Sequence, residues 1–261
     1  MYFILIIISL GASIIGALCG IGGGVIIKPA LDMLHVLSVP TISFLSGCTV
    51  LAMSFCSVIK DRMTGNTDID IKRSTPLAVG AIIGGLAGKW LFQSVSESFK
   101  HSERIGAIQS CLLAVTILGT LIYTLKKDAI RTRNITNLAT IIFIGLILGM
   151  LSSFLGIGGG PFNLAVLYYF FSMDTKMAAQ NSLYIIVFSQ AASLILTLIT
   201  GTVPQFEITM LVIMILCGIA GGYAGRKINK ILNSKAVEKS FLGFMVVIII
   251  INIYNILKFT N

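Results

Sequence analysis

Long apolar runs recur from one end of this chain to the other. Each holds roughly the 17–25 residues that an α-helix needs to span about 30 Å of hydrocarbon. Only 11% of the residues are charged, against about 25% in a soluble domain. We therefore expect an all-α integral membrane protein that crosses the cell (inner) membrane several times. The eight clear runs are Tyr2–Cys19, Val39–Ile59, Pro76–Phe92, Ile105–Leu125, Leu138–Leu155, Met177–Ile199, Ile208–Tyr223 and Phe241–Leu257.

The sequence repeats itself once, at a spacing of about 136 residues. The motif GIGGG occurs at Gly20 and again at Gly156, and GGLAGK at Gly84 is matched by GGYAGR at Gly221. A short basic stretch, Lys126–Arg133, separates the copies. The chain is therefore predicted to hold two membrane repeats, 1–130 and 131–261, within one membrane domain.

The lysines and arginines indicate how the two repeats are oriented. If each repeat has four spans, both sides of the membrane receive similar numbers of basic residues, against the positive-inside tendency. If the short segments 25–37 and 161–172 also cross, each repeat has five segments and the second is inverted. The basic loops 60–73, 126–133 and 226–239 then share one side. This arrangement predicts an excess of positive charge inside and both termini outside.

The two short segments follow the glycine motifs directly. A helix of about 13 residues reaches only about 20 Å, so whether segments 25–37 and 161–172 cross fully is open. Such segments are tolerated where glycine loops dip into the membrane against protein or water. Paired glycine-interrupted segments in inverted repeats point to a transporter site, so we expect the two short helices to meet near the membrane midplane.

The glycine loops themselves are candidate anion ligands. Glycine leaves backbone amides uncovered, and a helix start directs N–H groups and its positive dipole end toward an anion. Pro161 supports a helix start, since proline is favoured at the first helical position. The alternative is close helix packing by small residues, which we favour for the Gly84 and Gly221 groups. The loop residues predicted to bind substrate are Gly22, Gly23, Gly24, Gly158, Gly159 and Gly160.

Lys28 is a charged residue one turn into the first short segment. A charge at membrane depth indicates a functional site, and Lys28 is predicted to attract an anion, with neutral Asn163 near the same depth in the second repeat. The alternatives are snorkelling to the surface and an i,i+4 ion pair with Asp32. Asp32 and His35 are candidates for a coupling proton, although both fit the membrane interface as well.

Polar residues also interrupt the long run that follows each short segment. Cys48 and Thr49 lie in SGCTVL, and Asn181 and Ser182 lie in QNSLYI. Each is predicted either to bind oxyanion oxygens or to hold helices together. Two isolated glutamines, Gln109 and Gln190, are expected to be structural. The five cysteines lie in apolar runs and are expected to behave as small hydrophobic residues.

Taken together, these motifs resemble the sulfite exporter TauE/SafE family of membrane permeases. The likeness rests on GIGGG followed by Pro29 and Leu31, GIGGGP at Gly156, GNTDID at Gly65 and the paired GGxxGK/R stretches. It covers nearly the whole chain. The resemblance implies a secondary permease for sulfite, sulfonates or a related small anion, most often in the export direction. The sequence departs from the family at SGCTVL and QNSLYI, where a threonine-serine pair is common.

We therefore expect a secondary transporter, a probable exporter, that works by alternating access. The sequence contains no nucleotide-binding GxxxxGK[ST] motif, and we predict no cofactor, no metal, no catalytic residue and no nucleic-acid partner. The expected partners are a small anionic substrate and the lipid bilayer, and a homo-oligomer is left open. The rival functions are a passive anion channel and an importer of thiosulfate or sulfate. With two histidines in the chain, an intramembrane enzyme is disfavoured.

Overall fold

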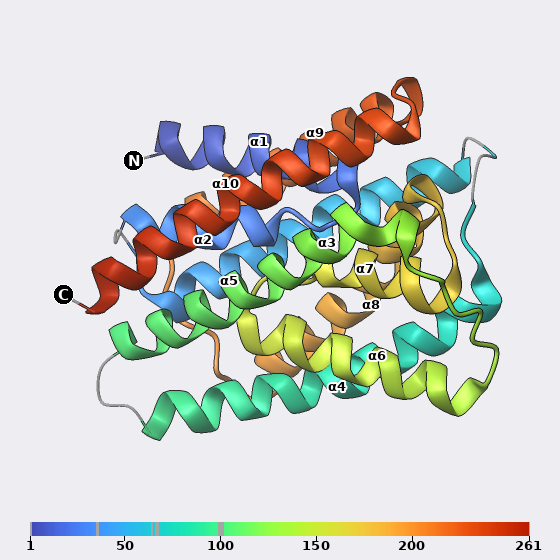
Figure 1. The fold of residues 1–261 in the computed structure, drawn as a ribbon. Coiled ribbons are helices and arrows are strands. Elements are labelled where there is room, and N and C mark those ends of the chain that lie inside the picture. The colour runs from blue at the N-terminus through green and yellow to red at the C-terminus, as the bar shows by residue number, and fades with distance from the viewer. Residues whose placement is uncertain (1, 35–36, 64, 66–67, 99–101, 261) are drawn as a thin grey trace.

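The computed structural model is built from helices packed into one bundle (Figure 1). It describes residues 2–34, 37–63, 65, 68–98 and 102–260. Within these ranges we find helices and connecting loops but no strand, as predicted. The helices are α1 (Tyr2–Cys19), α2 (Gly24–Leu34), α3 (Val39–Met63), α4 (Ile71–Ser98), α5 (Ser102–Lys126), the 3₁₀ turn η1 (Lys127–Ala129), α6 (Leu138–Leu155), α7 (Pro161–Phe171), α8 (Thr175–Ile199), α9 (Ile208–Ile231) and α10 (Ser234–Thr260).

Eight helices in the described ranges are long and apolar enough to cross a membrane, which confirms the eight predicted spans. Several extend past the apolar runs. Helix α4 begins at Ile71 and continues to Ser98, because helical hydrogen bonding continues where the polar ends leave the hydrocarbon. Large apolar side chains such as Trp90, Phe143 and Leu216 remain exposed on the helix surfaces, as expected of residues that face lipid.

The helix lengths repeat along the chain. Helices α1, α2 and α3 hold 18, 11 and 25 residues, and α6, α7 and α8 hold 18, 11 and 25. The two short helices are slightly shorter than the predicted segments: α2 ends at Leu34, and residues 35–36 lie outside the described part. Pro161 occupies the first turn of α7 as predicted, and Gly156 ends α6 in the left-handed conformation with φ +66°.

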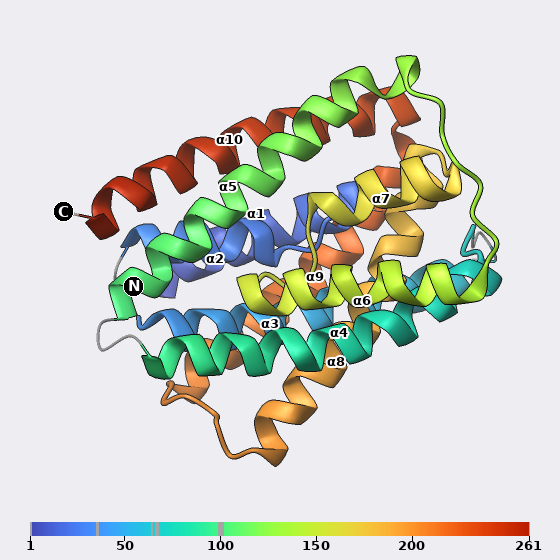
Figure 2. The same cartoon turned by 60° about the horizontal axis from the view of Figure 1, so that its bottom comes forward.

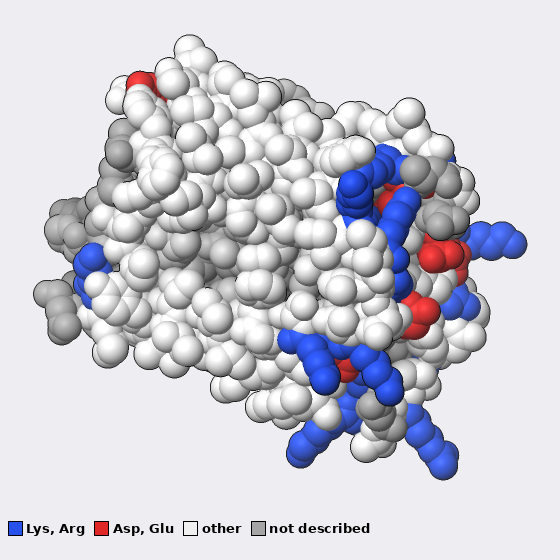
Figure 3. Space-filling model, turned by 90° about the horizontal axis from the view of Figure 1, so that it is seen from above, with Lys and Arg blue, Asp and Glu red and all other residues white. Residues whose placement is uncertain are grey.

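The two ends of the bundle differ in charge. The connections α5–α6, α7–α8 and α9–α10 lie at one end, together with the end of α3 and the start of α4. The start of α1, the end of α4, the start of α5, the α8–α9 connection and the end of α10 lie at the other (Figures 1 and 2). Lysine and arginine side chains gather at the first end, whereas most of the visible lateral surface is uncharged (Figure 3). We call these the basic end and the opposite end. Both termini share one end, as the predicted topology requires.

Glycines bring helices of the two halves into backbone contact. Helix α4 packs along α6, and α1 packs along α9. A Cβ atom built on Gly84 would lie 1.9 Å from the Leu146 carbonyl oxygen, and one on Gly225 would lie 2.2 Å from the Ile14 carbonyl oxygen. Only glycine permits these approaches, so the packing role predicted for the GGxxG motifs agrees with the structure. The first helix of each half thus packs against the fourth helix of the other half: α1 against α9, and α6 against α4.

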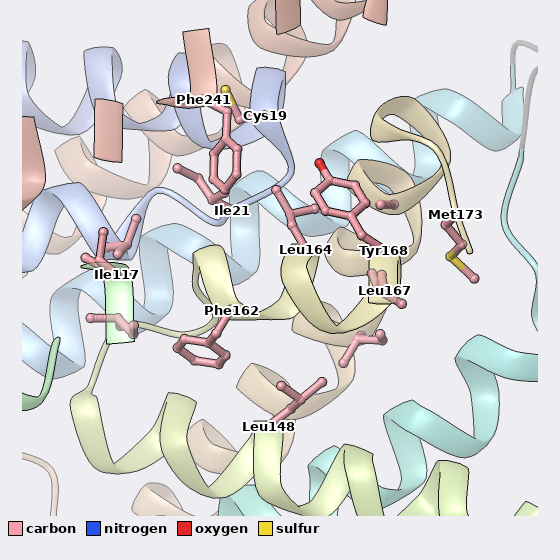
Figure 4. Packing of buried hydrophobic residues seen from close by; sticks show 14 of the residues in the cluster. Cys19, Ile21, Ile117, Leu148, Phe162, Leu164, Leu167, Tyr168, Met173 and Phe241 are labelled. Atoms are coloured by element: carbon pink, nitrogen blue, oxygen red, sulfur yellow. The ribbon is translucent and has the colours of Figure 1, made fainter. Parts of the chain in front are cut away.

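The short helix α7 lies inside the bundle. Its side chains Phe162, Leu164 and Tyr168 pack among Ile21 and Phe241 from other parts of the chain (Figure 4). A helix of this length is stable here because it is enclosed by protein and not by lipid. The second glycine loop, which directly precedes α7, is buried inside the bundle as well.

Candidate functional site

The two glycine loops touch each other in the interior of the bundle. A Cβ atom on Gly24 would lie 2.1 Å from the Ile157 carbonyl oxygen of the second loop. A Cβ atom on Gly22 would lie 3.9 Å from the Gly158 carbonyl oxygen, and Gly23 packs against α1 with a Cβ distance of 3.2 Å to the Ala12 carbonyl oxygen. The loops that precede the two short helices are therefore in contact, and a side chain larger than that of glycine would prevent this contact.

The second loop is held by neighbouring side chains. Gly158 faces the Gln190 amide, since a built Cβ atom would lie 3.0 Å from its Nε2. Gly159 lies against Ile186 and near the Asn163 amide, with a Cβ-to-Nδ2 distance of 3.6 Å, and Gly160 lies against Phe162. The Oδ1 atom of Asn163 is buried and has no hydrogen-bond partner among the described residues. It is available to a ligand or to water.

Lys28 and Asp32 form a buried ion pair on α2. The Lys28 Nζ atom lies 2.8 Å from the Asp32 Oδ2 atom, and each side chain is 2% exposed. The i,i+4 ion pair between Lys28 and Asp32, one of the alternatives considered from the sequence, is therefore present. The Lys28 stem also lies beside the second glycine loop, because a Cβ atom on Gly156 would be 3.3 Å from its Cε. The other carboxylate oxygen of Asp32 has no partner in the described part of the chain.

Replacing Lys28 with methionine is expected to destabilise the protein by about 3–5 kcal/mol, because the Asp32 carboxylate would be left buried without its cation. The double variant K28M/D32N should recover most of this loss. Thermal unfolding in detergent measures both variants. If the double variant is stable and still binds the anion within twofold of wild type, Lys28 is only the partner of Asp32 and the predicted anion contact is wrong.

A cavity of about 260 Å³ with both polar and apolar lining residues opens between α3, α4, α5, α6 and α8. It extends from Thr202 and Pro204 in the α8–α9 connection, at the opposite end, inward to Gly156 of the second glycine loop. At about 30 Å³ for each water-sized volume, it has room for a small anion and some of its hydration shell. Its polar lining residues are Ser43, Lys89, Gln93, Gln109, Ser152, Ser153, Gln190, Ser193, Thr197 and Thr202.

Lys89 is the charged residue of this lining. It projects from α4, and its ammonium group donates to the Thr197 hydroxyl and, at 3.5 Å, to the Ser193 carbonyl oxygen of α8. Neutral groups therefore surround this cation. Among the described residues Lys89 has no carboxylate partner, and an ammonium group in such a half-enclosed space attracts anions, since low dielectric strengthens the interaction. The arrangement can bind an oxyanion.

Further polar atoms of the lining lack partners. The hydroxyl groups of Ser43 and Ser153 and the Oε1 atom of Gln109 are buried and make no hydrogen bond to the described residues. The Gln109 amide nitrogen donates to the Phe154 carbonyl oxygen, which fixes its orientation. Buried polar atoms are rarely left unsatisfied, so these groups are available to water or to a ligand within the cavity.

Lys89, Gln109 and Gln190 were missed as site residues by sequence reasoning. The predicted span Pro76–Phe92 contains Lys89, which was not named as a ligand, and the two glutamines were expected to be structural. One signal was present: Lys89 ends the GGLAGK motif at the position where Arg226 ends GGYAGR. A basic residue repeated at that place within an apolar stretch indicates a shared role.

The remaining predicted ligands are not among the residues that line this cavity. The Thr49 hydroxyl donates to the Leu45 carbonyl oxygen of its own helix, and Cys48 is half-buried on α3. Asn181 holds the α3–α4 connection, accepting from the Asp70 amide and donating to the Asp68 carbonyl oxygen. Ser182 is buried, and its hydroxyl has no partner within the described ranges. His35 lies outside the described residues, and Gly22–Gly24, Gly158–Gly160 and Asn163 lie beyond the cavity lining.

Comparison with known proteins agrees with the motifs. The chain is 24% identical to the probable membrane transporter protein YunE of Bacillus subtilis, over 96% of this chain and 95% of that protein. It is 30% identical to a probable membrane transporter protein of Haemophilus influenzae over 61% of each. No solved structure matches it. The sequence model described as Sulfite exporter TauE/SafE matches residues 5–252, and the chain therefore belongs to the TauE/SafE family of membrane transporters.

Proposed function

We propose that this protein is a secondary transporter that exports sulfite, an organosulfonate or a related small anion by alternating access. The observation that carries the proposal is the cavity, which opens to one end of the bundle and contains a single lysine among hydroxyl and amide groups. The family description, sulfite exporter, supports the class of anion and the direction. A secondary transporter needs this combination of a polar site and access from one side.

The charge distribution supports an orientation. With the basic end in the cytoplasm, as the positive-inside rule expects, both termini and the mouth of the cavity face outside. The structure then corresponds to an outward-facing conformation, in which an exporter releases its anion. The repeated helix lengths and the exchanged pairing of α1–α9 and α4–α6 support two inverted repeats that rock against each other around a central site.

Each group of residues has a role in this proposal. Lys89 attracts the anion into the cavity, and the Ser43 and Ser153 hydroxyls donate to its oxygens, because these donors have no partner among the described residues. The glycine loops and Asn163 bind the anion at the deepest point of its path, when the repeats have moved apart. The unpartnered Asp32 oxygen is a candidate acceptor for a coupling proton. The contact between the glycine loops favours a carrier over a continuous channel.

Counterflow in proteoliposomes tests the function. Vesicles that contain the purified protein and excess unlabelled sulfite should accumulate external ³⁵S-sulfite transiently, because a carrier exchanges one anion for another. Parallel assays use sulfate, thiosulfate and an organosulfonate, and protein-free vesicles are the control. Absence of counterflow for all four anions, or single-channel currents in a bilayer, would contradict the carrier proposal.

A further inference from the structure

A second cation lies buried near the basic end of the bundle. Arg226 of α9 is 0% exposed, and its Nη2 atom lies 2.7 Å from the Oδ2 atom of Asp61 on α3. The other oxygen of Asp61 lies 3.8 Å from the Lys230 Nζ atom, one turn further along α9. This cluster joins α3 to α9. A charge pair this deeply buried is costly to form, so it is weak evidence for a purely stabilising role.

Arg226 holds the place in the second repeat that Lys89 holds in the first. Each ends a GGxxG motif, and each contacts the third helix of the other repeat: Lys89 meets Thr197 of α8, and Arg226 meets Asp61 of α3. The partners also correspond, because Asp61 and Thr197 each stand three residues before a Thr-Gly pair in the sequence. The Asp61–Arg226 contact is therefore the counterpart of the contact that borders the cavity.

We call the interface between α3 and α9 the α3–α9 seam, and the interface between α4 and α8 the α4–α8 seam. The helices approach each other more closely at one seam than at the other. At the α3–α9 seam, a Cβ atom on Gly222 would lie 2.8 Å from the Met53 carbonyl oxygen. At the α4–α8 seam, a Cβ atom on the corresponding Gly85 would lie 3.7 Å from the corresponding carbonyl oxygen, that of Ser189. The seam beside Lys89 is thus wider than the seam beside Arg226. If the α3–α9 seam widened to the same spacing as the α4–α8 seam, Arg226 would line a cavity as Lys89 does.

Most N–H donors of the Arg226 guanidinium have no acceptor among the described residues. Its Nε and Nη1 atoms are buried and make no hydrogen bond to the described residues. A guanidinium presents five N–H donors in a planar fork that matches an oxyanion, and the single short contact to Asp61 leaves most of them unused. A fully buried group of this kind is suited to a second anionic ligand.

We propose that Arg226 is the anion-binding residue of a second cavity that opens toward the basic end, and that Asp61 closes this site in the present conformation by occupying the guanidinium. Opening the α3–α9 seam separates the pair and exposes Arg226 to a small oxyanion, while the α4–α8 seam closes over Lys89. This inference rests on alternating access as proposed above, and adds the residues that close one side.

Cysteine accessibility tests the closure. In a background without the five native cysteines, S57C reports on the α3–α9 seam, where Ser57 is buried beside Gly222. S193C reports on the cavity of Lys89. In the wild-type charge background, S57C should be protected without anion and labelled from the basic end during sulfite exchange. Adding D61N should raise the S57C labelling rate at least about tenfold, or ~1.4 kcal/mol, and slow labelling of S193C.

Anion protection tests the binding site. With D61N present, sulfite or sulfate should slow labelling of S57C, and adding R226M should remove that protection while R226K retains part of it. If D61N does not fold, labelling of S57C during exchange in the wild-type background decides the matter. The proposal is overturned if S57C stays protected under every condition, or if protection by the anion survives R226M.

These outcomes are separable from those of the proposed function. Absence of counterflow in the wild-type protein contradicts the transporter proposal, whatever the labelling shows. Normal counterflow in R226M contradicts the role of Arg226 and leaves the transporter proposal intact. The labelling of S57C in D61N requires no transport, so it reports on closure by Asp61 alone.

Discussion

Replacing Lys89 with methionine is expected to reduce anion affinity and counterflow by about tenfold to a hundredfold. The loss corresponds to about 1.5–3 kcal/mol for a hydrogen bond to a charged group. Lys89 is the cation of the cavity lining, and its contacts within the bundle are to a hydroxyl and a carbonyl oxygen. Removing it takes away positive charge without leaving a buried carboxylate unpaired. Binding and counterflow are measured with ³⁵S-sulfite on the purified protein.

Two matched variants separate charge from packing. K89R keeps the positive charge and should retain most of the counterflow. T197V removes the hydroxyl that accepts from Lys89 but leaves the charge in place, so it should cost less than threefold, about 0.6 kcal/mol. Sulfite affinity in K89M within twofold of wild type would show that Lys89 does not bind the anion and would remove the main support for the cavity as the site.

Replacing Gly84 with alanine is expected to destabilise the bundle by about 2–3 kcal/mol, and replacing it with leucine to prevent folding. A methyl group on residue 84 would lie 1.9 Å from the Leu146 carbonyl oxygen. Because this oxygen belongs to the backbone of α6, it cannot move aside by a side-chain rotation to relieve the clash. Overpacking usually costs about 1–3 kcal/mol. For a chain of this size, that loss lowers the unfolding temperature by roughly 5–10 °C. Thermal unfolding by intrinsic fluorescence in detergent measures it.

Gly119 provides the matched control. It also lies within a long helix, α5, but a Cβ atom built on it meets nothing within 4 Å. G119A should leave the unfolding temperature unchanged or raise it slightly, because alanine favours a helix by up to about 1 kcal/mol over glycine. Equal losses in G84A and G119A would mean that helix propensity, and not the contact of α4 with α6, decides stability.

Much of the fold could be predicted from particular residues. The eight apolar runs predicted the long helices because a membrane span needs a nearly continuous apolar length. Gly156 and Pro161 predicted where α6 ends and α7 begins, since a left-handed glycine and a first-turn proline act locally. The paired GGxxG motifs predicted the close helix contacts, which the Gly84 and Gly225 distances bear out.

The site was predicted less well. Lys28 was correctly placed inside the protein, but sequence spacing could not decide between an anion contact and the pair with Asp32, because both fit one helical turn. Lys89 lies within the predicted span Pro76–Phe92 and was not named as a ligand, because the sequence does not show that its side chain lines a cavity. Gln190 could not be told from a packing residue, because which way it faces depends on how α8 is rotated against α3 and α4.

The sequence by itself determined the eight long apolar helices, the two glycine breaks and the concentration of positive charge in the loops 60–73, 126–133 and 226–239. Those features depend on hydrophobicity, backbone freedom and charge, which act along the chain over short distances. Only the tertiary structure decided that the glycine loops touch, that Arg226 contacts Asp61, and that Lys89 has no carboxylate partner in the part of the chain that the structure describes. These facts depend on contacts between residues more than a hundred positions apart, which helix rotation and packing across the two repeats determine.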